Sequence, residues 1–202
     1  HFYQNMSKWT FAVGLLMFFI ILLFSKPILS VFGDDFTVGS VALVILSCGS
    51  LVKASIGIAE VMIIMTGNTW LNTVNTIMAL VLGTVLSFWL IPRFGVVGAA
   101  IAITGVGFIL NLVRVLEVFA LFRLLPYNKG FIKPLVAGAV AAIATYAMAQ
   151  WVFVKSNLVA TGLNIGFLMA VYVAVVLLLG LSEEDRIVLA HLRGRLKAAL
   201  PG

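Results

Sequence analysis

The sequence of 202 residues has very few of the side chains from which enzyme and metal sites are built. Its one cysteine, Cys48, excludes an intrachain disulfide, and its two histidines, His1 and His191, stand at opposite ends of the chain. Histidines, cysteines and carboxylates are not grouped at the spacing of metal ligands, so no metal site is expected. No activated nucleophile is evident either, and we predict a protein that is not an enzyme and that needs no cofactor.

Charged side chains are scarce as well. They make up 10% of the chain, against about 25% in soluble domains. Hydrophobic residues make up 63%, and the mean hydropathy is +1.20, so the composition is that of a membrane protein. The net charge of +6 does not predict a nucleic-acid partner, because the basic residues are not gathered on one soluble face among aromatic residues.

Six apolar stretches are long enough to cross a bilayer, which needs about 20 residues per helix. They predict an all-α, polytopic membrane bundle of six transmembrane helices over residues 1–181. Residues 182–202 combine a candidate N-cap with leucines on one face and basic residues off it, which predicts a cytoplasmic amphipathic helix. The predicted spans are residues 9–32, 37–65, 71–91, 96–125, 134–154 and 159–181.

The distribution of basic residues predicts the orientation. Lysines and arginines total eight on the side that would hold both ends of the sequence, and three on the other side, where they are Lys26, Arg93 and Lys155. Because cytoplasmic loops are enriched in these residues, both ends are expected to be cytoplasmic. The first residue is not methionine and no signal peptide precedes the first span, so we expect the sequence to be part of a longer chain.

The stretch "LIPRFGVVGAAIAITG", residues 90–105, interrupts the apolar pattern with a proline and a series of small residues. Pro92 disfavours helix before it, so the third span is predicted to end at residue 91, and Gly95 permits a tight reversal. Gly98 and Gly105 lie among alanines and are predicted to let neighbouring helices approach closely in lipid.

Four ionisable residues lie within the predicted spans, where charge is costly and therefore indicates function. Lys53 and Glu60, seven residues apart, are expected to share one face of the second span. Arg114 and Glu117, three residues apart in the fourth span, can pair directly. Counted at about 1.5 Å per residue from the outer ends of these spans, all four residues lie toward the cytoplasmic leaflet.

Together these features resemble a known family. "LIPRFGVVGAAIAITG" is similar to a hairpin of the polysaccharide-biosynthesis transporters, the lipid-linked oligosaccharide flippases of the multidrug/oligosaccharidyl-lipid/polysaccharide exporter superfamily. The stretches "SVFGDDFTVGSVALVILSCGSLV", "MIIMTGNTW", "LNLVRVLEVFALFRLLPY" and "FIKPLVAG" agree with that family in order and spacing.

The resemblance implies fourteen helices with both ends cytoplasmic, of which this sequence would supply the last six and lack the N-terminal half. It further implies a multi-pass protein of the bacterial inner membrane that flips an undecaprenyl-type lipid-linked oligosaccharide by alternating access. Such a carrier serves the biosynthesis of surface polysaccharide, as in lipopolysaccharide and O-antigen. The expected partners are membrane lipid, that cargo and a coupling cation, either proton or sodium.

On this interpretation Lys53 and Arg114 meet the anionic headgroup of the cargo, with Glu60 and Glu117 as their charge partners. The alternative is that these residues only pair with one another or reach the membrane edge. The amides that could bind a sugar, or a neighbouring helix, are Asn72, Asn75 and Asn111.

Other functions stay open. Within the same superfamily, the alternative is a multidrug or peptidoglycan-precursor exporter. A different class is a membrane glycosyltransferase or polymerase that holds a metal through Asp34 and Asp35, although adjacent aspartates more often mark a turn. A non-transporting assembly subunit is a third interpretation.

Overall fold

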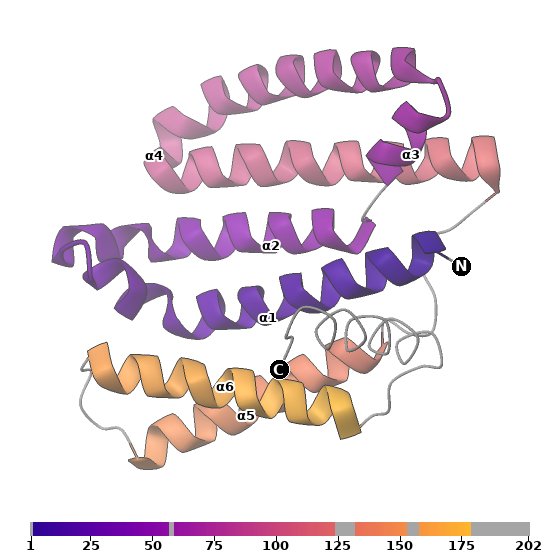
Figure 1. Cartoon of the computed structure of the whole chain (residues 1–202). Coiled ribbons are helices and arrows are strands. Elements are labelled where there is room, and N and C mark those ends of the chain that lie inside the picture. The colour runs from indigo at the N-terminus through magenta and orange to yellow at the C-terminus, as the bar shows by residue number, and fades with distance from the viewer. Residues whose placement is uncertain (1, 57–58, 124–131, 153–157, 179–202) are drawn as a thin grey trace, which may run out of the picture.

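The computed structural model describes residues 2–56, 59–123, 132–152 and 158–178, and these form helices and turns without strands (Figure 1). The predicted all-α, polytopic helical fold is confirmed. The tail of residues 182–202, which we predict to be an amphipathic helix, lies outside the described residues. The elements are α1 (Phe2–Ser30), the 3₁₀ helix η1 (Asp34–Gly39), α2 (Ser40–Ile56), α3 (Ala59–Met65), α4 (Thr69–Phe122), α5 (Ile132–Val152) and α6 (Leu158–Leu178).

By length and composition, four segments of the described chain can cross a membrane, namely Ser7–Ser30, Asp34–Ile56, Thr69–Leu121 and Ala160–Leu178. Ile132–Met148 is a shorter apolar helix. Within the most apolar window of each of the four segments, only 17–33% of the residues are buried. Most of the apolar surface of these helices therefore faces outward, as in a helix layer that is surrounded by lipid or by further helices.

The helix α4 covers two predicted spans, because it reverses its direction at Gly95. Its first arm, residues 69–94, and its second arm, residues 96–122, run side by side (Figure 1). Gly95 has φ +55° and ψ −129°, close to the first central position of a type II′ turn at about +60° and −120°. This conformation favours glycine, so Gly95 makes the predicted reversal. The predicted end of the span at Ile91 is wrong, since the helix continues through Pro92 to the glycine.

Gly98 makes the reversal compact. A Cβ atom on Gly98 would overlap the carbonyl oxygen of Leu90 and would lie 2.7 Å from the carbonyl carbon of the same residue. The close contact at Gly98 is thus with the other arm of its own hairpin. A Cβ atom on Gly105 would meet nothing within 4 Å in the described part of the chain. The close packing predicted for Gly105 therefore stays a prediction.

The second predicted span is broken into three pieces, η1, α2 and α3. The last piece ends in a turn in which Gly67 has φ +82°. The N–H groups of Gly67 and Asn68 donate to the carbonyls of Ile64 and Ile63, at 3.1 and 3.2 Å. Such bonds satisfy carbonyl groups at the end of a helix and turn the chain toward α4.

The helices pack in a row that positions α2 beside the α4 hairpin. In Figure 1 the row runs from the first arm of α4 through its second arm, α2 and α1 to the pair α5 and α6. Close approaches at glycines connect neighbours in this row, because a Cβ atom on Gly49 would lie 3.0 Å from Thr104, and one on Gly14 would lie 3.0 Å from the Cβ of Ala54. The turn of α4 and η1 lie at one end of the helices, on the left of Figure 1, and α3 lies at the opposite end, on the right.

Candidate substrate-binding site

The ionisable residues of the spans lie toward the end of the helices at which α3 packs against the α4 hairpin. The shared core here consists of Ile56, Ile63 and Val118, with Val52 and Val115 packed against it. These residues come from α2, α3 and the second arm of α4, so a small apolar cluster holds three helical segments together. The polar side chains described next extend from the same segments.

Arg114 forms an ion pair across this junction. Its Nη2 lies 3.3 Å from Oε2 of Glu60, which belongs to α3. The side chain of Arg114 is 14% exposed and that of Glu60 is 39% exposed, so the pair lies at the edge of the packed region. A guanidinium inside a span needs such a partner, because an isolated charge is costly there.

The ion pair does not use all the hydrogen-bonding capacity of Arg114. Its Nε is buried and has no hydrogen-bond partner among the described residues. A buried donor without an acceptor is costly, and this cost distinguishes Arg114 from a guanidinium whose donors are all paired. A planar guanidinium with a free edge suits a phosphate or a carboxylate.

Glu117 is held by the other arm of the hairpin. The side-chain amide of Asn75 donates to its Oε2 at 2.8 Å, across 42 residues of sequence. Asn75 is 1% exposed, so this bond ties the two arms together near their open end. A hydrogen bond to a charged group stabilises by about 1.5–3 kcal/mol, more than one between neutral groups.

These pairs differ from the ones we predict from spacing. Arg114 contacts Glu60 rather than Glu117. Lys53 and Glu60 do not share a face of one helix, because α2 ends at Ile56 and α3 begins at Ala59. Spacing along one helix treats Lys53 and Glu60 as parts of a single element, whereas the structure places Glu60 in α3, where its carboxylate reaches Arg114 of α4.

Lys53 lies in the last turn of α2 and is exposed. A cation at this position interacts favourably with the negative end of the helix dipole. Its sequence neighbour Val52 and the sequence neighbour of Arg114, Val115, pack against the same apolar cluster. Within the described chain, Lys53 has neither an ion pair nor a hydrogen bond.

The remaining predicted residues differ in exposure. Asn111, one helical turn before Arg114, is 4% exposed, whereas Asn72 is half-buried. Asp34 and Asp35 are exposed in η1, and the described residues contain no group of three or more histidine, cysteine, aspartate or glutamate side chains that could hold a metal ion.

Our sequence analysis did not single out several buried polar residues. The hydroxyl of Thr104 donates to the carbonyl of Ile45 at 3.1 Å and joins α4 to α2, opposite Gly49. Thr145 and Asn164 are buried in α5 and α6, and each has one side-chain oxygen without a hydrogen-bond partner in the described part of the chain. The sequence feature that could have identified these residues is that each is a polar residue within a long apolar run.

The fold defines a class, the polytopic α-helical membrane proteins with a layer of paired, membrane-length helices. A solved structure with this fold is the lipid II flippase MurJ in an inward closed conformation, which the chain matches with a TM-score of 0.74 at 17% sequence identity. The match covers 86% of this chain and 37% of the flippase, so the chain spans well under half of the length of that protein. No family model and no curated protein matches the sequence.

The likeness to this flippase confirms the predicted all-α, polytopic membrane fold.

An experiment can separate the observed pairing of Arg114 from the predicted one. The effects of Arg114→Gln and Glu60→Gln on the free energy of unfolding should be coupled. The double variant should lose about 0.5–3 kcal/mol less stability than the two single variants lose together. Thermal unfolding of the purified protein in detergent measures this. Glu117→Gln is the matched control, and its coupling to Arg114→Gln should be smaller. A larger coupling with Glu117 than with Glu60 would contradict the observed pairing.

Proposed function

We propose that this chain is part of a transporter that moves a lipid-linked, phosphate-bearing precursor across the bacterial inner membrane by alternating access. The observation that carries the proposal is the combination of a flippase fold with two cations inside the predicted spans, Lys53 and Arg114, neither of which has its donors fully used within the described residues. Moving such a lipid breaks no bond, so the proposal requires no nucleophile.

The cations would receive the phosphate of the cargo from the cytoplasmic side. Arg114 would bind through its free edge while Glu60 holds the rest of the guanidinium in place. Lys53, exposed at the end of α2, would make a more mobile contact. The side-chain amides that would bind the sugars or neighbouring helices are those of Asn72, Asn75 and Asn111. In this proposal the first helices of the carrier would belong to a part of the protein that precedes residue 1.

We propose a lipid-linked oligosaccharide of surface polysaccharide biosynthesis, such as O-antigen, as the cargo. A peptidoglycan-precursor lipid is the second candidate, which the name of the matching flippase favours. Transport of fluorescent lipid-linked glycans in proteoliposomes that contain the full-length protein tests both. Movement of the oligosaccharide lipid but not of lipid II supports the first cargo. Movement of lipid II alone supports the second, and movement of neither would contradict the proposed function.

The orientation has its own test. With Cys48 replaced by alanine, a cysteine at Asp35 in η1 should react with an impermeant maleimide from outside the cell, and one at Met65 should not. Met65, at the end of α3, is 82% exposed and should be cytoplasmic if both ends of the sequence are. A permeant maleimide should label both variants and serves as the control. Labelling of position 65 alone from outside would reverse the orientation.

A further inference from the structure

Two buried polar side chains of the pair α5 and α6 take no part in the candidate site. Thr145 is 0% exposed and Asn164 is 5% exposed. The Oγ1 atom of Thr145 and the Oδ1 atom of Asn164 have no hydrogen-bond partner among the described residues. Buried polar atoms in native proteins are almost always bound to protein or to ordered water, because an unpaired one costs free energy. Both atoms therefore need a partner.

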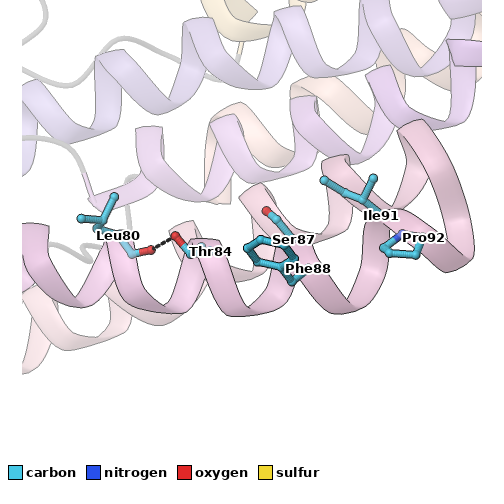
Figure 2. Close-up of a pocket in the computed structure, with 7 residues that line it drawn as sticks. Leu80, Thr84, Ser87, Phe88, Ile91 and Pro92 are labelled. Carbon is cyan, nitrogen blue, oxygen red and sulfur yellow. Dashed lines mark hydrogen bonds between the residues drawn. The ribbon is translucent and has the colours of Figure 1, made fainter.

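The hydroxyl of Thr145 is placed differently from those of other threonines in the long helices. Thr84 donates its hydroxyl hydrogen to the carbonyl of Leu80 at 2.8 Å, drawn as the dashed line in Figure 2. Thr76 donates in the same way to the carbonyl of Asn72, also at 2.8 Å. These hydroxyls are satisfied by the residue four positions earlier in their own helix. Within the described chain the hydroxyl of Thr145 makes no such bond, so it is available to a partner from outside α5.

A three-helix seam forms where α1, α5 and α6 pack together (Figure 1). Ala141 of α5 shares an apolar cluster with Tyr172 of α6, whose hydroxyl donates to the carbonyl of Ala12 in α1 at 2.8 Å. Thr145 and Asn164 continue the buried faces that make these contacts, because each residue follows its face at four-residue spacing. The two faces are Ala137, Ala141 and Thr145 in α5, and Asn164, Leu168 and Tyr172 in α6.

The register of α5 and α6 brings the two polar side chains to nearly the same level. The helices run in opposite directions, and Ala141 packs in one cluster with Tyr172. One turn onward from Ala141 is Thr145, and one turn back from Tyr172 is Leu168, so Thr145 and Leu168 lie at about one level. Asn164 is one turn further back, about 6 Å along the axis. The two unpaired oxygens thus come from facing helices about one turn apart, a separation that bound water can bridge.

The kink of α1 adds polar backbone to the seam at this level. Phe24, where the chain leaves helical geometry with φ −120° and ψ 16°, packs in one cluster with Leu168. Pro27 has no N–H group, so it cannot donate to the carbonyl of Leu23, which is four residues earlier. Ser25, beside Phe24, is 8% exposed. Polar groups of three helices thus occur at one level of otherwise apolar packing.

The unpaired atoms need a ligand that both accepts and donates hydrogen bonds. The hydroxyl of Thr145 offers a hydrogen, whereas Oδ1 of Asn164 can only accept one. A water molecule accepts from the first and donates to the second, and its other hydrogen is left for a backbone carbonyl such as that of Leu23. A metal cation would bind both oxygens but would leave the hydroxyl hydrogen without an acceptor. The donor and acceptor set of the seam therefore suits water.

We propose that the three-helix seam encloses ordered water at the level of the α1 kink, bound by the hydroxyl of Thr145 and the side-chain oxygen of Asn164. This water connects α5 to α6 through polar contacts inside the apolar layer. The seam lies at the opposite end of the helix row from the α4 hairpin, so the proposal holds or fails independently of the transported cargo (Figure 1).

Thermal unfolding of the full-length protein in detergent tests the proposal. Thr145→Val keeps the shape of the side chain and removes its hydroxyl, so with water bound it should lower the melting temperature by about 2–4 °C. Removal of a hydroxyl that has no partner would instead raise the melting temperature. Thr84→Val is the matched control and should change it little, because Thr84 is exposed and bonds within its own helix.

Radiolytic footprinting of the same protein locates the water, because hydroxyl radicals formed from bound water modify the side chains beside it. Leu168, which is 0% exposed, should be modified. Leu15, which is 1% exposed, is the control and should not be modified, since it lies next to Gly138, two turns before Thr145 in α5. Thr145→Val should abolish the modification of Leu168.

A melting temperature that Thr145→Val raises or leaves unchanged, or equal modification of Leu168 and Leu15, would overturn the proposal. A melting temperature that rises with sodium chloride but not with choline chloride, and that no longer does so in Asn164→Leu, would assign the seam to a cation. That result would overturn the proposal as well.

Discussion

Gly98→Ala is expected to destabilise the protein by at least about 1–3 kcal/mol, although it adds a single methyl group. Glycine to alanine within a helix ordinarily stabilises by about 0.5–1 kcal/mol, because alanine loses less backbone entropy on folding. At Gly98 the added Cβ would overlap the carbonyl oxygen of Leu90 in the opposite arm of the hairpin. The two arms would have to separate at the turn, and backbone atoms cannot move aside as the end of a flexible side chain can.

Gly105→Ala is the matched control for this prediction. It lies two turns further along the same arm, and its Cβ would meet nothing within 4 Å in the described residues, so this variant should be as stable as the original or slightly more so. Thermal unfolding of both variants in detergent, followed by size-exclusion chromatography, gives the comparison. Equal melting temperatures for Gly98→Ala and the unchanged protein would show that the hairpin is not as tight as described.

The sequence predicts the hairpin well because the signals for it are local. Gly95 needs a backbone conformation that other residues rarely adopt, and the small residues after it can be identified without knowledge of their neighbours. The exact end of the first arm was predicted three residues too early. Proline disfavours helix at the residue before it, but in a membrane helix the freed backbone groups can be satisfied elsewhere, so Pro92 does not end the helix.

The pairing of the charges could not be predicted in the same way. Spacing along one helix favours Arg114 with Glu117, yet each of these residues finds its partner on another segment. These contacts depend on the packing of α3 against the α4 hairpin and on the register of that hairpin, which brings Asn75 to Glu117 across 42 residues. Both are properties of the tertiary structure. The sequence of residues 71–122 could identify which polar side chains are costly to place in a membrane span. It could not identify which atoms would bind those side chains and so offset the cost.

Lys53→Ala is expected to abolish most transport while the amount of protein in the membrane is unchanged. A lysine costs about 2.5–3.5 kcal/mol on insertion scales at the centre of a span and less near its end, so alanine should insert at least as well at this position. Lys53 has no ion pair within the described chain, and its removal leaves no carboxylate there without a partner. If its ammonium contacts the phosphate of the cargo, losing a charged hydrogen bond of about 1.5–3 kcal/mol lowers affinity about tenfold or more.

Surface glycan and membrane protein level, measured together in cells that depend on the full-length protein, test this prediction. Lys53→Arg should retain part of the activity, because it keeps the charge at the end of α2. Lys26→Ala is the matched control, since Lys26 is also exposed but lies in α1, on the side predicted to be outside the cell. Because Glu60 already pairs with Arg114 and Glu117 with Asn75, neither Glu60→Gln nor Glu117→Gln should restore transport to Lys53→Ala. Full transport by Lys53→Ala, or its rescue by either glutamine, would remove Lys53 from the path of the cargo.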